Sequence, residues 1–87
     1  MAKYRKKPVV IEAQRIGIDP WMDAAWEAVT RHDITLHECG KPGGFIIVKT
    51  LEGAMRGNHG DWLIRGVGGE LYVCKPHIFE QTYEPVE

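Results

Sequence analysis

The sequence contains no serine, a single asparagine and only two cysteines among its 87 residues. Without serine, every mechanism that depends on a serine nucleophile is excluded. Two cysteines do not make a disulfide framework, and in a reducing compartment we expect them to be small buried apolar residues. No apolar run approaches the roughly 20 residues that span a bilayer, and the apolar stretch after the N-terminus is too brief for a secretory signal. We therefore expect a cytoplasmic protein with no membrane partner.

The chain is also too short for a second hydrophobic core. Because domains usually have roughly 100–200 residues, we expect one domain over residues 1–87. Hydrophobic residues make up 44% of the chain and charged residues 26%, with a formal net charge of -1, which is typical of a folded protein. A chain of this size buries only about 60% of its unfolded surface, so self-association is a natural source of further stability. The composition therefore favours a homo-oligomer.

Alternation and glycine spacing predict an α+β fold in which most strands are antiparallel. Val9, Ile11 and Ala13 alternate with more polar positions, as in a half-buried strand. From Gly40 onward, glycines divide the chain into short pieces rich in β-branched and aromatic residues. We predict strands at about 9–14, 34–38, 44–50, 53–57, 61–66 and 70–74. They would form a small antiparallel β-meander, or a partly closed barrel, of about five to six strands.

One amphipathic helix is predicted after the first strand, over residues 20–32. Asp19 can accept hydrogen bonds from the free amides at the helix start, and Pro20 suits the first helical position. Apolar side chains at helical spacing form the expected buried face, which consists of Met22, Trp26 and Val29 with Ala25 beside them.

The two ends of the chain carry charges of opposite sign. The basic residues at the start are Lys3, Arg5, Lys6 and Lys7, and the acidic residues at the end are Glu80, Glu84 and Glu87. We expect a brief helical turn over 77–81, followed by an edge strand at 83–86 beside the first strand. Pairing of the two ends would let these charges neutralise each other.

No metal or catalytic site is predicted. Two cysteines and two histidines could in principle bind zinc, but the spacings of His37, Cys39, Cys74 and His77 match no common finger or ribbon. Cysteine catalysis would require Cys74, His77 and an orienting carboxylate such as Glu80 to meet in a pocket, and nothing in the spacing requires this. We expect no catalytic residues and no cofactor. The pI near 6.4 argues against duplex DNA as a partner.

The stretch from Arg56 to Gly66 is the candidate binding site. It joins a glycine-bounded polar turn to arginines on both sides and one tryptophan. Arginine offers a planar fork to phosphate, and tryptophan offers a stacking face to a base, so such a set can hold a small nucleotide. The residues assigned to ligand binding are Arg56, Asn58, His59, Trp62, Arg65, Arg5 and Lys7.

A structural interpretation of the same stretch competes with this one. In it, Asp61 forms hydrogen bonds within its own turn, Trp62 belongs to the core, and the arginines are solvated. We likewise expect Trp21 and Tyr83 to lie in the core or at an oligomer interface instead of a binding site.

Several segments occur in an order and at distances that resemble one family. They are Tyr4–Ala13, Lys49–Gly53, Gly60–Val67, Glu70–Pro76 and Ile78–Glu80. Together they resemble the small tailed-phage proteins called PGDYG-domain proteins. The chain departs from the motif that names the family: His59 stands in place of the usual proline, Trp62 in place of tyrosine and Leu63 in place of glycine.

This resemblance implies a phage or prophage accessory protein in the cytoplasm of a bacterial host, with no catalytic residues to carry over. Our leading hypothesis is a non-enzymatic homo-oligomer that binds and sequesters a small anionic, phosphate-bearing ligand, such as a cyclic nucleotide immune signal, as an anti-defence sponge. The alternative is a protein-interaction module, either a virion or packaging accessory or an inhibitor of a host protein. Such a module would dock through an exposed sheet edge or the Trp21 side of the helix. A hydrolase that uses Cys74, His77 or a metal ranks last.

Overall fold

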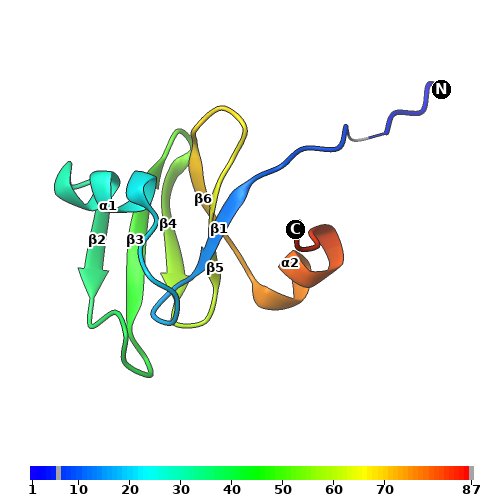
Figure 1. Cartoon of the computed structure of the whole chain (residues 1–87). Helices are drawn as coiled ribbons and strands as arrows, with labels where there is room; N and C mark the ends of the chain where they lie inside the picture. Colours follow the sequence, from blue (N-terminus) through cyan, green and yellow to red (C-terminus); the bar gives the residue numbers. More distant parts are fainter. Residues whose placement is uncertain (6, 87) are drawn as a thin grey trace.

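The structure is a computed structural model that describes residues 1–5 and 7–86. Within these residues, six short strands form two antiparallel sheets of three, in the orders β1-β5-β6 and β2-β3-β4 (Figure 1). Two short helices complete the fold. The elements are β1 (Glu12–Arg15), α1 (Asp23–Thr30), β2 (Ile34–His37), β3 (Phe45–Thr50), β4 (Gly53–Asn58), β5 (Trp62–Arg65), β6 (Leu71–Cys74) and α2 (Pro76–Thr82).

The predicted fold class is wrong. Instead of an α+β fold with one meander or a partly closed barrel, the described chain is a small, mostly-sheet domain whose two sheets remain separate. The division falls between β4 and β5, which are consecutive but unpaired, because β5 pairs with β1 and β6 instead. In the turn between them, the His59 amide donates to the Gly44 carbonyl, and the next amide, at Gly60, donates to the Ile16 carbonyl. The chain therefore passes from the β2-β3-β4 sheet to the β1-β5-β6 sheet within this turn.

Helix α1 begins later than the predicted start at residue 20. Asp19 does not cap it, because its carboxylate accepts a hydrogen bond of 2.8 Å from the amide of Arg15. Met22 is the N-cap residue, and its amide donates to the side-chain oxygen of Gln14 at 2.8 Å. The chain between β1 and α1 is therefore held by hydrogen bonds back to β1, and the helix forms only after them.

The buried face of α1 agrees with the predicted one except at Trp26. Ala25 and Ala28 are fully buried, and Met22 and Val29 pack against the core, whereas Trp26 is 51% exposed. Helix α1 packs on β2, and alanine allows the helix backbone to lie close to the strand. The large side chain of Trp26 therefore lies on the outer surface.

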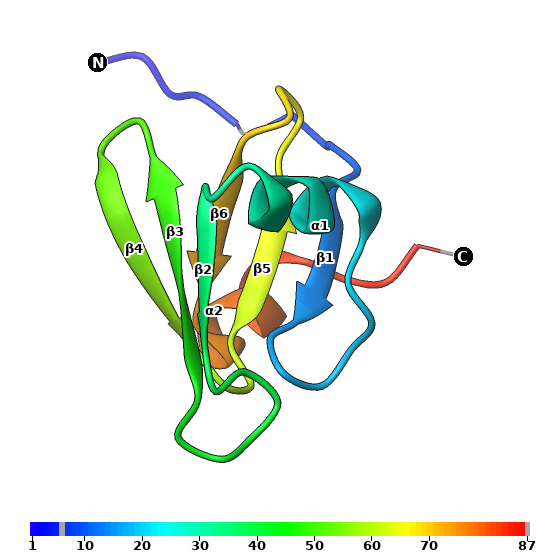
Figure 2. The same cartoon turned by 90° about the vertical axis from the view of Figure 1, so that its left-hand side faces the viewer.

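The core lies between the two sheets and beneath α1. Strands β3 and β4 pack on β6, which brings the inner faces of the two sheets together (Figure 2). Alternation along β3 sends Ile46 and Val48 inward. The buried apolar cluster consists of Ile16, Ala25, Ala28, Ile34, Ile46, Val48 and Leu63.

The two ends of the chain differ from the predictions. The first strand starts at Glu12 and not at residue 9. Residues 7–11 are extended and lie across from Tyr83 and Glu84, and residues 1–5 project from the body as an arm (Figure 1). The predicted turn at 77–81 is part of α2, and the described residues 83–86 contain no strand. With the arm, the molecule measures 46 × 25 × 24 Å. Neither helix of the described chain has the length and apolarity required to cross a membrane.

Candidate functional site

The outer face of the β2-β3-β4 sheet presents aromatic and cationic side chains. The register pairs His37 with Phe45, and Phe45 with Asn58. Directly opposed residues point to the same side of a sheet. Since Ile46 and Val48 point into the core, Phe45 and its partners lie on the opposite, outer side.

Three planar groups meet on this face. The rings of His37 and Phe45 are stacked, with centroids 4.6 Å apart and an interplanar angle of 9°. The guanidinium carbon of Arg56 lies 3.7 Å from the centroid of the Phe45 ring. Because β2 and β4 flank β3, the imidazole and the guanidinium approach Phe45 from the two neighbouring strands.

Polar side chains hold the outer members of this group in place. Asn58 Oδ1 accepts a hydrogen bond of 2.9 Å from Arg56 Nε. The Thr35 hydroxyl lies 3.3 Å from His37 Nε2. These contacts occupy Nε and one face of the exposed Arg56 guanidinium, whose two Nη groups make no hydrogen bond to the described residues. The arginine fork is therefore oriented before any ligand arrives.

This face is electropositive. The sequences of β2, β3 and β4 are ITLH, FIIVKT and GAMRGN, so they contain no carboxylate. Lys49 is exposed, and since it lies four residues after Phe45 on the same strand, it points to the same side. Arg56 and Lys49 therefore make the outer face suitable for an anion.

The structure brings only two of the sequence-predicted site residues into contact, Arg56 and Asn58. His59 points inward, and its Nδ1 is buried without a hydrogen-bond partner among the described residues. Arg65 donates to Glu12 at 2.9 Å across the β1-β5 pair. Arg5 lies on the exposed arm, Lys7 lies across from Tyr83 and Glu84, and Lys6 lies outside the described residues. In a single copy of the chain, the predicted ligand-binding residues therefore do not form one site.

Asp61 and Trp62 have structural contacts. Asp61 is buried and accepts hydrogen bonds from the Asn58 amide at 2.9 Å and from Lys75 Nζ at 3.0 Å. Trp62 stacks on Phe79 of α2, with centroids 4.0 Å apart and an interplanar angle of 7°. The Arg15 guanidinium lies 5.6 Å from the Trp62 ring. Trp62 therefore packs α2 against the sheet, and the hydrogen bonds of Asp61 stabilise its own turn.

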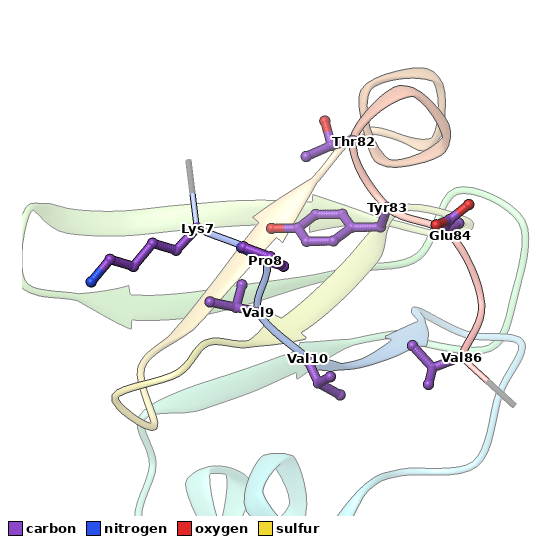
Figure 3. Close-up of a pocket in the computed structure, with 8 residues that line it drawn as sticks. All are labelled: Lys7, Pro8, Val9, Val10, Thr82, Tyr83, Glu84 and Val86. Carbon is purple, nitrogen blue, oxygen red and sulfur yellow. The ribbon is translucent and has the colours of Figure 1, made fainter. Parts of the chain in front are cut away.

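An apolar groove runs beside Trp62 on the outer side of the β1-β5-β6 sheet. Its volume is about 870 Å³. Its lining residues are Val9, Val10, Ile11, Ala13, Trp62, Phe79, Glu80, Tyr83, Glu84, Pro85 and Val86. A neighbouring pocket of about 530 Å³ shares Val9, Val10 and the C-terminal segment and reaches Lys7 and Thr82 (Figure 3). We call this joined surface the groove.

The two thiols are poorly suited to nucleophilic attack. Burial raises the pKa of the Cys39 thiol, and burial followed by the nearby Asp61 carboxylate raises the pKa of the Cys74 thiol. A raised pKa lowers the fraction of reactive thiolate at neutral pH. The described residues include no cluster of three or more metal-ligating side chains.

Sequence reasoning missed Phe45 and His37 as site residues. The useful signal was the short turn at Leu51 and Glu52, which fixes the register of a hairpin and places Phe45 opposite Asn58. In comparisons with protein-family models, curated proteins and solved structures, nothing matches this chain. The resemblance to PGDYG-domain proteins therefore stays a prediction.

Proposed function

We propose that this chain is a non-enzymatic binding protein that works as a homo-oligomer and holds a small phosphate-bearing ligand, such as a cyclic nucleotide. The binding site in this proposal is the outer face of the β2-β3-β4 sheet. The observation that carries it is the Arg56 guanidinium, held 3.7 Å over Phe45 and oriented by Asn58. In a phage protein of the PGDYG type, such binding would sequester a nucleotide immune signal in the host cytoplasm.

The chemistry of the face suits a nucleotide in two respects. The free Nη groups of Arg56 can pair with a phosphate as a fork, and Lys49 adds a second positive charge. The exposed imidazole of His37 and the outer surface of the guanidinium offer planar groups on which a base can stack. Binding of this kind weakens as salt is added, because the charges are exposed.

The test is a calorimetric and thermal-shift titration of the purified protein with cyclic dinucleotides and cyclic mononucleotides. At about 100 times its dissociation constant, a ligand stabilises the folded state by about 2.7 kcal/mol. Arg56→Lys keeps the charge but removes the fork and the stacking plane, so we expect at least about tenfold weaker binding. The matched control is Arg31→Lys on an exposed ion pair outside this face. Absence of heat and thermal shift with every nucleotide, or equal affinity of Arg56→Lys and the control, would contradict the proposal.

One observation favours the alternative, a protein-interaction module. The rings of Trp21 and Trp26 lie 6.4 Å apart, and Trp26 is 51% exposed on α1. Exposed tryptophan is enriched at protein interfaces. If this alternative is correct, the chain binds a purified host or phage protein. We expect Trp26→Ala to abolish that binding and nucleotides to leave it unchanged.

A further inference from the structure

We infer that two copies of the chain associate by exchanging N-terminal arms, so that the arm of each copy lies along the groove of the other. The arm comprises residues 1–5, and residues 7–11 stay in the groove of their own copy. This inference deepens the homo-oligomer part of the proposed function by naming the surfaces that meet, and it does not depend on the ligand.

The arm is extended, apolar in part and exposed. Residues 1–5 belong to no helix or strand and are all exposed. Tyr4 is 93% exposed. Figures 1 and 2 show the N-terminal residues leaving the body instead of folding back onto it. An arm with these side chains gains apolar burial when it lies on a second surface.

The groove supplies an apolar surface of matching character. The stacked rings of Trp62 and Phe79 form part of it, and Tyr83 lies next to Phe79, with ring centroids 5.0 Å apart. Val86 lies in the C-terminal segment on its other side (Figure 3). A chain segment with aromatic and aliphatic side chains fits this lining.

Charge identifies the occupant as the arm of a second copy. The lining of the groove includes the carboxylates of Glu80 and Glu84. The arm carries Lys3 and Arg5. Ion pairs among the described residues join Arg31 to Asp33, Arg65 to Glu12 and Lys75 to Asp61, and none of them involves the arm or these two carboxylates. Both sets of charges are therefore available for pairing between copies.

The course of the chain favours exchange over folding back. Residues 7–11 already line their own groove, and residues 1–5 lead away from it (Figure 1). A two-fold axis lets both arms make the same contact, which is the usual symmetry of a dimer.

The test is sedimentation of the full chain from about 10 µM to 1 mM at low salt. The groove variant carries Glu80→Lys and Glu84→Lys, and the arm variant carries Lys3→Glu and Arg5→Glu. We expect a wild-type dimer that weakens as salt is raised and at least about tenfold weaker dimerisation of each variant alone. An equimolar mixture of the two variants should form a mixed dimer, because the reversed charges match again. All the substituted residues are exposed, so both variants should keep the wild-type circular dichroism spectrum.

The matched control is Glu27→Lys with Glu52→Lys, which changes the net charge as the groove variant does but at exposed sites on α1 and in the β3-β4 turn. A wild-type chain that stays monomeric at 1 mM would overturn the inference. So would a groove variant that dimerises as well as the control, or a mixture that forms no mixed dimer. Titration of the arm variant with the nucleotides used above separates the two proposals, since arm exchange predicts lost dimerisation whether or not the ligand binds.

Discussion

Gly17 lies where the chain leaves β1 on its way to α1, and it has no room for a side chain. Its φ of 80° is in the left-handed region that glycine favours, and an added Cβ would lie 2.5 Å from His59 Nδ1. Gly17→Ala therefore combines a backbone penalty with a clash against a partly buried ring. We expect a loss of about 2–4 kcal/mol in the free energy of unfolding, measured by urea denaturation.

Gly43 provides the matched control for this prediction. Its φ is 85°, but an added Cβ would meet nothing within 4 Å. Gly43→Ala should therefore show the backbone penalty alone, about 1–2 kcal/mol. Equal losses in the two variants would mean that the inward position of His59 is wrong.

Tyr72 gives the molecule a pH dependence at alkaline pH. Burial, and then the hydrogen bond of 3.2 Å with Tyr83, raises the pKa of Tyr72 from 10.0 to about 12. A group whose pKa is raised by folding stabilises the fold below its unfolded pKa and loses this effect as pH rises through its folded pKa. The free energy of unfolding should therefore fall between about pH 10 and pH 12.

The measurement is a titration of tyrosinate absorbance in the native protein. One of the three tyrosines should ionise late, and Tyr72→Phe should remove that late step. Tyr4→Phe, at a 93% exposed position on the arm, is the control and should leave the step in place. A late step that persists in Tyr72→Phe would assign it to another residue.

Few contacts hold α2 to the sheet. None of its residues is buried, Phe79 stacks on Trp62, and its C-cap residue Tyr83 shares a hydrogen bond with Tyr72 of β6. We expect Phe79→Ala to cost about 1.5–3 kcal/mol and to release α2 from β5. Hydrogen exchange should then speed up at the α2 amides while the β3 amides stay protected.

Ile78 is the neighbouring control for this prediction. Its side chain is 46% exposed, so Ile78→Ala should cost less than about 1 kcal/mol and leave exchange in α2 unchanged. If Phe79→Ala left the exchange of α2 unchanged as well, another contact would hold the helix.

The elements also show what the sequence could predict. The last five strands are confirmed to within one residue at each end, because each combines local alternation with glycine or polar turns at both ends. The first strand starts three residues later than predicted. Its partner β5 ends at Arg65, opposite Glu12, so the residues before Glu12 have no strand to pair with. Alternation does not reveal where a partner strand ends.

The candidate site was predictable only in part for a related reason. Arg56 and Asn58 are two residues apart on β4, so the sequence placed them together correctly. Trp62 follows closely along the chain but belongs to the other sheet. Phe45 is distant along the chain but lies beside Arg56. Proximity along the sequence was therefore a poor guide across the turn at Asn58, where the chain changes sheets.

At the scale of the whole molecule, Gly57 lies where the two sheets approach each other closely. It lies on β4, and an added Cβ would meet Ile16 Cδ1 at 2.5 Å, Val73 Cγ2 at 3.1 Å and Ile46 Cγ1 at 3.3 Å. Two of these neighbours, Ile16 and Val73, come from the β1-β5-β6 side. Gly57→Ala should therefore push the sheets apart and cost about 1–3 kcal/mol in the free energy of unfolding.

A double-mutant cycle shows whether this cost arises between the sheets. Ile16→Val removes the Cδ1 atom that lies nearest to the added methyl group, and alone it should cost about 0.5–1.5 kcal/mol. In the double variant, the methyl group at position 57 occupies the space that Ile16 has vacated. The combined loss should therefore be smaller than the sum of the single losses by at least about 0.5 kcal/mol, measured by urea denaturation of all four proteins. Additive losses would mean that the two sheets do not meet at Gly57.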